Sequence, residues 1–284
     1  MTSQPPSVDA IAEQLSAFSV TLADAVAEVT LLGPGNGNAM GEAFWRELPM
    51  VFAALDGDPR VAAVVLTGSG AHFSVGLDLH DMLPRWAGVL AAGAQAAPRT
   101  EFLHEVRRLQ DAVTSVANCR KPVIAAVSGW CIGGGVDLIA AADVRLASAD
   151  ATFSIREVKL AIVADLGSLH RLVGIIGDGQ LRELALTGKD IDAARAERIG
   201  LVNEVYPDRA ATLASAHAMA QQIAANPPLA VYGTKEVLNS DREHRVAQGL
   251  RQVAAWNAAF LPSEDLSEAL AAFTERRPAN FRGR

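Results

Sequence analysis

Short hydrophobic runs alternate with longer amphipathic stretches along the first half of the chain. Residues 18–32 alternate in polarity around Ala23 and Asp24, which predicts a β-hairpin, and the turn-forming residues 33–37 end it. The continuous hydrophobic run over residues 61–67 is typical of a strand buried on both faces. The chain is therefore expected to open with a hairpin and to continue, after a helix, into a buried strand.

Two stretches place hydrophobic side chains at steps of three and four, which is the spacing of one helix face. The first covers residues 40–55 and ends at Gly57-Asp58-Pro59, and the second covers residues 102–116. The second leads into a hydrophobic run over residues 122–127, which predicts another buried strand. Helices that alternate with buried strands indicate a parallel α/β core.

The order of elements changes after a further predicted strand at residues 143–148. From about Asp208 onward the pattern is almost wholly helical, with a break at Pro227-Pro228. Residues 83–98 lack clear periodicity, so we expect a mobile loop or a loose helix there, near whatever the protein binds. The chain thus divides into a flexible leader, a core with the functional site and a helical C-terminal region: residues 1–14, 15–207 and 208–284.

Composition and charge narrow the class of protein. Of the 284 residues, 50% are hydrophobic and 20% are charged, which predicts a globular fold and argues against disorder or a coiled coil. A net charge of −7 with a pI near 5.4 argues against a nucleic-acid groove or an anionic membrane surface. No uncharged hydrophobic run reaches the roughly 18 residues of a membrane span. We therefore expect neither nucleic acid nor a membrane as a partner.

Several features concern the compartment. The two cysteines, Cys119 and Cys131, form no CxxC pair and no disulfide framework, which indicates a reducing environment. Arg46 is the first basic residue, so neither a secretion signal nor an Arg-rich presequence is expected. Residues 281–284 do not form a peroxisomal tripeptide. We predict a cytoplasmic protein.

Three segments follow predicted buried strands, where open α/β sheets gather their ligands: residues 72–79, 128–137 and 153–167. The second carries Gly133-Gly134-Gly135 ahead of a predicted helix, and bare N–H groups at such a helix start suit an anion or a developing oxyanion. Neither dinucleotide nor P-loop glycine spacing occurs, which disfavours nucleotides. Close helix packing is the alternative role for these glycines.

The histidines show no metal-ligand spacing, so we expect no metal site.

The residues of these segments carry a family resemblance. Gly76-Leu77-Asp78-Leu79, residues 121–129 and the glycine run closely resemble the crotonase (enoyl-CoA hydratase/isomerase) superfamily, from Phe18 to the C-terminus. The resemblance implies an α/β spiral of ββα units whose helical C-terminal region makes trimer contacts, often within a hexamer. It also implies an acyl-CoA thioester as substrate, without a separate cofactor. The backbone N–H groups of Leu77 and Gly134 would form an oxyanion hole for the thioester oxygen.

The acidic residues separate the possible reactions. Hydratases of this superfamily use two glutamates, whereas this chain has Asp137 at the first position and Glu157 at the second. Aspartate is one methylene shorter, and about 1 Å of misplacement costs on the order of 100-fold in rate, which weakens the hydratase interpretation. A third acid, Asp165, stands in a hydrophobic stretch where an unpaired carboxylate is costly.

This three-acid pattern resembles the Δ3,5-Δ2,4-dienoyl-CoA isomerase subgroup, where Asp, Glu and Asp occupy these positions. Converting a 3,5-dienoyl thioester to its 2,4 isomer removes a proton from C2 and adds one at C6, far enough apart to make two acid/base groups useful. The resemblance implies that Glu157 and Asp165 exchange protons with C2 and C6, in that order, while Asp137 orients or electrostatically tunes the pair. Residues 39–47 and 253–257 resemble the subgroup outside the site. The pathway would be fatty-acid β-oxidation.

Other interpretations remain open at this stage. An enoyl-CoA hydratase is the nearest, followed by a non-catalytic acyl-CoA-binding oligomer and, more remotely, a nucleotide-dependent dehydrogenase. Singly, Asp137 is typical of an acid at a helix start, and Glu157 of a surface ion pair. Asp78 is expected to cap a helix, and Cys131 to fill the core rather than act as a nucleophile. Late basic residues are typical of a solvated tail or of a contact with CoA: Arg276, Arg277, Arg282 and Arg284.

Overall fold

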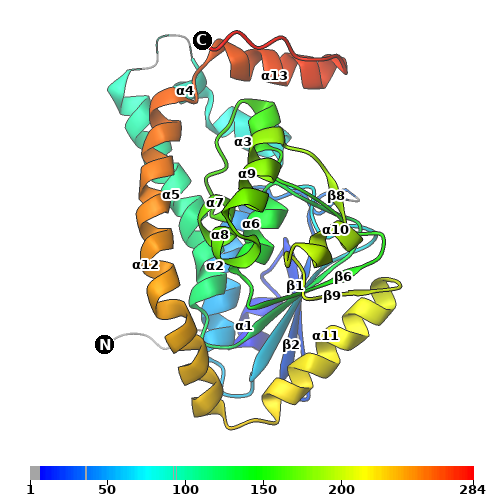
Figure 1. Ribbon diagram of the computed structural model, residues 1–284. Coiled ribbons are helices and arrows are strands. Elements are labelled where there is room, and N and C mark those ends of the chain that lie inside the picture. Colours follow the sequence, from blue (N-terminus) through cyan, green and yellow to red (C-terminus); the bar gives the residue numbers. More distant parts are fainter. Residues whose placement is uncertain (1–6, 36, 92, 94) are drawn as a thin grey trace.

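The computed structural model describes the chain except for residues 1–6, 36, 92 and 94 (Figure 1). A large sheet at its centre has the strand order β1-β2-β3-β4-β6-β9. Strand β1 is antiparallel to β2, and each later neighbour is parallel. Its strands are Phe18–Ala23, Val26–Leu31, Ala63–Gly68, Val123–Val127, Val144–Ser148 and Glu204–Tyr206. The parallel core predicted from alternating helices and buried strands is confirmed.

The hairpin of β1 and β2 turns one residue later than its predicted centre at Ala23 and Asp24. Its last pair is Ala23 with Val26, and the two turn residues, Asp24 and Ala25, have φ values of +50° and +63°. Two residues with positive φ form the turn type whose twist matches that of the flanking strands. The predicted turn at residues 33–37 includes position 36, which lies outside the described residues.

A second, smaller sheet is formed by β5 (Trp130–Ile132), β7 (Thr152–Ser154) and β8 (Ile191–Asp192). The segment that follows one parallel strand of the large sheet pairs with the segment that follows the next strand. These pairs are Met40 with Leu77, Ser74 with Cys131, and Cys131 with Phe153. The chain therefore winds as a spiral, and this expectation is confirmed. The winding aligns the loops that follow successive strands, which places the functional segments together.

Helices cover both faces of the large sheet (Figure 1). α2 (Glu42–Gly57) and α5 (Ala96–Asn118) pack on the face with the main hydrophobic core. On the other face, α11 (Arg209–Ala224) packs Ala216 and Ala220 against Val65 and Ile124. These small side chains let the helix approach the sheet closely. The remaining helices before α11 are α3 (Leu79–Arg85), α4 (Ala87–Leu90), α6 (Gly134–Ala141), the 3-10 helix η1 (Glu157–Leu160), α7 (Ser168–Arg171), α8 (Val173–Ile176), α9 (Asp178–Thr187) and α10 (Ala193–Arg198).

The C-terminal region is helical, as its pattern predicts. α12 (Pro228–Phe260) begins directly after Pro227, so the predicted break at the two prolines separates α11 from α12. α12 runs the length of the molecule beside α5, and α13 (Glu264–Glu275) lies across one end (Figure 1). Within the described residues, no helix is long and hydrophobic enough to cross a membrane.

Two expectations about irregular segments need correction or refinement. The leader expected over residues 1–14 contains a helix, α1 (Val8–Ala12), whose Val8 and Ile11 are buried against α2 and the adjoining core. Two buried hydrophobic side chains hold this segment in place, while residues 1–6 lie outside the described residues. In the segment 83–98, the helical alternative is confirmed by the end of α3, by α4 and by the start of α5.

Candidate active site

Two backbone N–H groups from successive turns of the spiral lie close together. Leu77 stands between β3 and α3, where Met40 N donates to Gly76 O at 2.8 Å and Asp78 N donates to Met40 O at 3.1 Å. Successive residues of an extended segment direct their backbone groups to opposite sides, so the N–H of Leu77 faces away from Met40. Gly134 opens α6, and the first N–H groups of a helix lack intrahelical acceptors.

Glycine is required where these two segments meet. Gly76 has φ +87°, and a Cβ there would lie 2.8 Å from Ile132 O and 3.3 Å from Gly134 N. A Cβ on Gly134 would lie 4.0 Å from Leu77 N. Within the described part of the chain, neither Leu77 N nor Gly134 N donates to a backbone acceptor outside a helix or strand. Two neighbouring N–H groups without such an acceptor suit one oxygen atom that carries developing negative charge.

The first predicted acid, Asp137, lies in the first turn of α6 and is buried. Its Oδ1 accepts a 2.5 Å hydrogen bond from the backbone N–H of Ser168, the first residue of α7. Burial raises the pKa of Asp137 to about 6, although the Ser168 hydrogen bonds and the charge of Arg171 lower it. Asp137 is therefore a carboxyl group that titrates near neutral pH and has one oxygen held in place.

Arg171 is a fully buried cation behind this acid. Its Nη2 donates to Thr114 Oγ1 at 3.1 Å and lies 3.5 Å from Glu243 Oε2. Burial lowers the pKa of Arg171, whereas the negative charges of Glu243 and Asp137 raise it. The positive charge of the buried guanidinium thus offsets part of the negative charge of Asp137.

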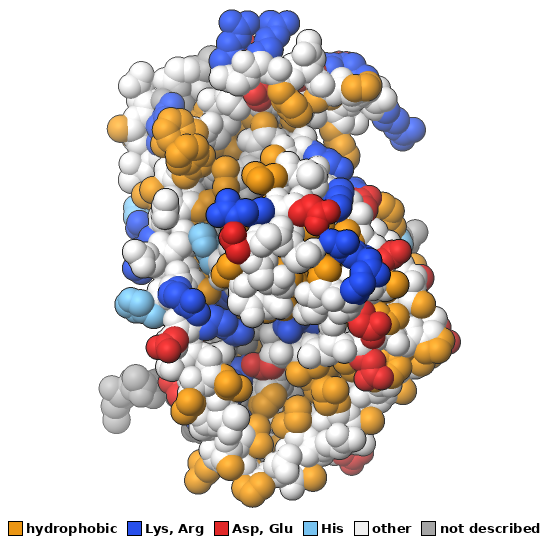
Figure 2. All heavy atoms as spheres, viewed as in Figure 1, with side chains coloured by type: hydrophobic (Ala, Val, Ile, Leu, Met, Phe, Trp, Pro, Cys, Tyr) orange, Lys and Arg blue, Asp and Glu red, His pale blue; other side chains and the backbone are white. Residues whose placement is uncertain are grey.

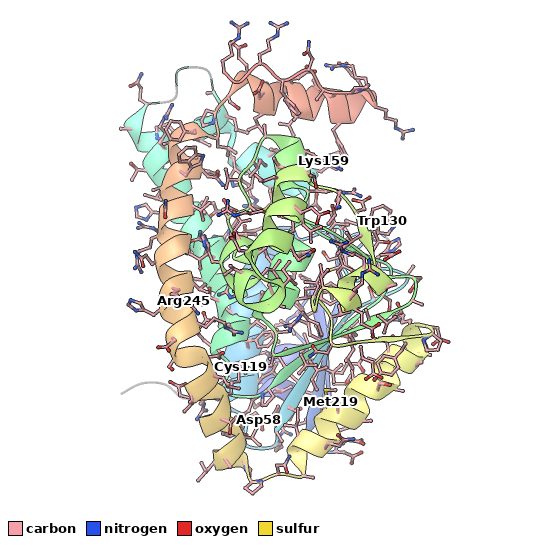
Figure 3. The ribbon with its side chains drawn as sticks, in the orientation of Figure 1. Asp58, Cys119, Trp130, Lys159, Met219 and Arg245 are labelled. Atoms are coloured by element: carbon pink, nitrogen blue, oxygen red, sulfur yellow. The ribbon has the colours of Figure 1, made fainter. Side chains whose placement is uncertain are left out.

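Glu157 presents its carboxyl group to the glycine run. A Cβ on Gly133 would lie 3.4 Å from Glu157 Oε1, and Gly133 N is tied to Ser154 O at the end of β7 by a 2.9 Å hydrogen bond. Lys159, labelled in Figure 3, shares helix η1 with Glu157 and marks the position of this segment below α13. Although Glu157 as a residue is partly exposed, its Oε2 is buried.

The carboxyl groups of Asp137 and Glu157 interact with each other. Burial, the charge of Asp137 and, less strongly, that of Asp165 hold the pKa of Glu157 well above its usual value. Among the described residues, neither Asp137 Oδ2 nor Glu157 Oε2 has a nitrogen or hydroxyl partner. Burial and the mutual repulsion of these carboxyl groups disfavour the state in which all of them are ionised.

Asp165 lies between η1 and α7 and completes the group of acids. Asn257 of α12 donates from Nδ2 to Asp165 Oδ2 at 2.7 Å, and Gln110 of α5 donates from Nε2 to the backbone oxygen of Asp165, also at 2.7 Å. Burial raises the pKa of Asp165 to about 7, the Asn257 hydrogen bond lowers it, and the charge of Asp137 raises it. The spiral therefore brings the three predicted acids into one buried site.

Several roles predicted from sequence are decided by these contacts. Asp78 caps α3 by accepting from the N–H groups of His80 and Asp81, as predicted. Cys131 is buried, and burial raises the pKa of its thiol, so it fills the core as predicted.

Among the late basic residues, Arg277 pairs with Glu268 and Glu275, and Arg284 with Glu264. A contact of this tail with CoA stays a prediction.

Three residues that hydrogen-bond to the acids, and one whose charge acts on Asp137, are absent from the sequence-based site: Gln110, Ser168 and Asn257, and Arg171. Asn257 is placed outside the site by its sequence context, and the structure corrects this because α12 folds back across Asp165. Gln110 and Asn257 could have been found from the sequence, since each is a polar residue within the hydrophobic face of a helix. Ser168 acts through its backbone N–H, which side-chain identity does not reveal.

Comparisons with known proteins identify the family of this chain. The enoyl-CoA hydratase/isomerase family matches residues 21–284. The "Delta(3,5)-Delta(2,4)-dienoyl-CoA isomerase, mitochondrial" of Dictyostelium discoideum is 44% identical over 90% of this chain and 87% of that protein. The peroxisomal protein of the same name from Arabidopsis thaliana is 42% identical over 87% of this chain and 89% of its own length. A "Probable enoyl-CoA hydratase" of Rhizobium meliloti is 37% identical over 90% of this chain and 94% of its own.

Solved structures show the same fold. An enoyl-CoA hydratase/isomerase from Xanthobacter autotrophicus superposes with a TM-score of 0.80 at 30% identity, covering 93% of this chain and 100% of that one. One from Pseudoalteromonas atlantica also gives a TM-score of 0.80, at 26% identity, over 94% of this chain and 100% of its own. The chain belongs to the enoyl-CoA hydratase/isomerase family, and its fold is the crotonase fold.

Proposed function

We propose that the protein is a Δ3,5-Δ2,4-dienoyl-CoA isomerase. The observation that carries this proposal is the third acid, because Asp165 shares one buried site with Asp137 and Glu157. The Dictyostelium and Arabidopsis relatives carry this name and cover most of the chain, which supports the same substrate class. The pathway proposed for it is fatty-acid β-oxidation.

The reaction moves one proton and rearranges two double bonds. A base takes a proton from C2 of the 3,5-dienoyl thioester, and the electron pair spreads over the thioester oxygen, C2, C4 and C6. The backbone N–H groups of Leu77 and Gly134 stabilise the thioester oxygen of this dienolate. An acid then donates a proton to C6, which leaves the 2,4-diene. Atoms and electrons balance without an oxidant, so we propose that no cofactor takes part and that CoA is only part of the substrate.

Glu157 exchanges the proton at C2 and Asp165 the proton at C6. This order requires an ionised Glu157 and a protonated Asp165 when the substrate binds. The raised pKa of Glu157 makes its ionised form a stronger base. Asp165, with a pKa of about 7, holds and releases a proton readily at neutral pH. After each turnover the proton returns from Glu157 to Asp165.

Asp137 orients and tunes this pair rather than reaching the substrate. Its Oδ1 is held by Ser168 N, and its charge raises the pKa values of both Glu157 and Asp165. The burial of Asp137 and its shorter side chain also weigh against hydratase chemistry, in which a glutamate stands at this position. Three intact acids weigh against a binding protein without catalysis.

A paired assay on the purified protein tests the proposal. One arm follows conjugated-diene absorbance formed from 3,5-dienoyl-CoA, and the other follows loss of enoyl absorbance from a 2-enoyl-CoA. Fast isomerisation with slow hydration supports the isomerase. Fast hydration with slow isomerisation overturns it in favour of a hydratase working through Asp137 and Glu157, and silence in both arms with acyl-CoA still bound favours the binding-only alternative.

We also propose that the protein assembles as a homotrimer or as a hexamer of two trimers, through residues 208–284. Trp256 and Phe260 on α12 are 54% and 61% exposed, and their rings lie 4.7 Å apart. Figure 2 shows hydrophobic side chains gathered over this end of α12. Exposed aromatic pairs are typical of surfaces that a partner covers. The net charge of −7 supports the expectation that neither nucleic acid nor a membrane is a partner.

For the compartment we propose the cytoplasm. Both cysteines are free and buried, which suits a reducing environment. The relatives named above include mitochondrial and peroxisomal proteins, so cell fractionation followed by immunodetection is the deciding measurement.

A further inference from the structure

The side-chain amide of Asn257 joins the long C-terminal helix to the active site. Its Nδ2 donates both hydrogens, one to Asp165 Oδ2 at 2.7 Å and one to Val163 O at 2.9 Å. The residue is only 2% exposed. With both donors engaged, the amide has one orientation, and it holds the carboxyl group of Asp165 and the backbone two residues before it at the same time.

A second amide holds the backbone of Asp165. Gln110 of α5 is buried, and its Nε2 donates to Asp165 O at 2.7 Å and to Leu250 O of α12 at 3.0 Å. Gln110 therefore links the same loop residue to the same helix that carries Asn257. The backbone and the side chain of Asp165 are each fixed by a buried amide, and α12 takes part in both connections.

The loop needs such support because it has little regular structure of its own. It follows Ala161, which ends η1 in a left-handed conformation with φ +56°, and it continues irregularly to the start of α7 at Ser168. Val163 in this loop is exposed. Proton transfer requires heavy atoms within hydrogen-bonding distance, so a loosely held Asp165 would meet C6 less often in a productive geometry.

We propose that Asn257 is a positioning residue, which fixes the Asp165 carboxyl group for proton transfer while Gln110 fixes the backbone beneath it. This inference rests on the proposed isomerase function. Because Nδ2 engages Oδ2, the other oxygen of Asp165, Oδ1, is left for the substrate. Helix α12 thereby serves the active site as well as the proposed subunit contact.

The pH dependence of kcat would depend on the titratable groups that surround Asp165. Asp137 of α6 and Glu157 of η1 are the acids that interact with it, and Arg171 of α7 faces Asp137 from behind. The N–H donor of Asn257 stabilises the ionised form of Asp165 and so lowers its pKa. Loss of that donor raises the pKa of Asp165, which moves the pH dependence of kcat upward.

The test compares Asn257→Ala with Asn239→Ala. Asn239 lies on the same helix and donates from Nδ2 to Ala117 O at 3.3 Å, so its loss removes an amide contact of α12 away from the site. We expect N257A to lower kcat by about 10- to 100-fold with KM within about two-fold, and N239A to keep both within about two-fold of wild type. An N257A kcat within two-fold of wild type, or an equal loss in N239A, overturns the inference.

Hydrogen exchange separates this inference from the proposed function. In D2O, Asp165→Asn should abolish isomerisation and stop deuterium incorporation at C6, the carbon assigned to Asp165. N257A should slow incorporation at that same carbon and leave the other unchanged. If D165N isomerises normally, the proposed two-carboxylate function fails. If D165N is inactive but N257A exchanges both carbons at wild-type rates, only the positioning role fails.

Asn257→Asp keeps the size of the side chain and supplies a variant should N257A fail to fold. An ionised carboxylate at this position repels Asp165, whereas its protonated form again donates one hydrogen bond. We expect N257D to be impaired about 10-fold or more at pH 8 and to recover part of its kcat toward pH 6. A folded N257D whose loss is the same at both pH values contradicts positioning through the donor.

Discussion

The backbone N–H of Ser168 donates a 2.5 Å hydrogen bond to Asp137 Oδ1, and this contact joins the start of α7 to α6, the helix that follows the glycine run. Gly167, with φ +134°, turns the chain immediately before Ser168, and a Cβ on it would overlap Arg171 Nη1. One oxygen of Asp137 is thus held by the backbone while the carboxyl group still interacts with Glu157. The contact lowers the pKa of Asp137 against the effect of its burial.

Asp165→Asn should remove the second acid/base group with little change in shape. We expect turnover of 3,5-dienoyl-CoA to fall by about 10²- to 10⁴-fold, which is the usual contribution of one general acid or base. Binding of acyl-CoA, measured by isothermal titration calorimetry, should stay within about three-fold, because the oxyanion N–H groups are untouched. Diene turnover near the wild-type rate would refute the two-carboxylate mechanism.

Gly76→Ala should damage the oxyanion site. A Cβ at Gly76 would lie 2.8 Å from Ile132 O, and φ at this position is +87°. We expect kcat to fall by about 10²- to 10³-fold, comparable to the loss of one oxyanion donor. Gly70→Ala is the matched control, because φ at Gly70 is also positive, at +67°, but no atom lies within 4 Å of the added carbon. Equal losses of activity in both variants would show that backbone strain alone is responsible.

The stability of the protein should depend on pH through Asp165. Burial raises its pKa from the usual 3.8 to about 7, so between these pH values the folded chain keeps a proton that the unfolded chain releases. Its contribution to stability is therefore fully present below about pH 3.8 and is lost as pH rises toward 7. We expect the Tm of D165N to exceed that of wild type by several degrees at pH 8, and by less at pH 5. Thermal melts showing a gap independent of pH would contradict this assignment.

Arg171→Met should leave Asp137 without its buried cation, while Glu243 keeps its 3.2 Å contact with Arg242. We expect the free energy of unfolding to fall by about 3–5 kcal/mol, the range for removing one partner of a buried ion pair. The pKa of Asp137 should rise, because the cation lowers it, and the pH–rate profile should move upward. Arg182→Met is the control, since Arg182 pairs with Asp178 at the surface, where losing an ion pair should change the free energy of unfolding far less. Urea unfolding of both variants gives the comparison, and equal losses would contradict it.

Phe260→Asp should weaken subunit association if this end of α12 is a contact. A charge in the centre of a hydrophobic contact is costly to bury, so the mass measured by light scattering should fall toward that of one chain. Leu186→Asp on α9 is the control, because Leu186 is also well exposed but lies outside residues 208–284. An unchanged mass for the Phe260 variant would place the interface elsewhere.

Much of the fold was predictable from local patterns. The turn at Asp24, the C-terminal end of α2 and the break at Pro227 depend on residues close in sequence, and each lies at or next to the position that the pattern predicts. Strands β8 and β9 were not predicted, because two or three residues carry too little periodicity to stand out. Helix α1 was not predicted either, since its burial depends on α2 rather than on its own sequence.

The sequence by itself determined the chemistry available to this protein: glycines where close approach is required, and acids at 137, 157 and 165 within hydrophobic surroundings. Tertiary structure decided how those groups act. Only folding brings Ser168 N to Asp137, Arg171 behind it, and Asn257 from 92 residues away to Asp165. The physical reason is that pKa values and proton-transfer geometry depend on distance and burial in space, which a chain acquires only when its distant segments pack together.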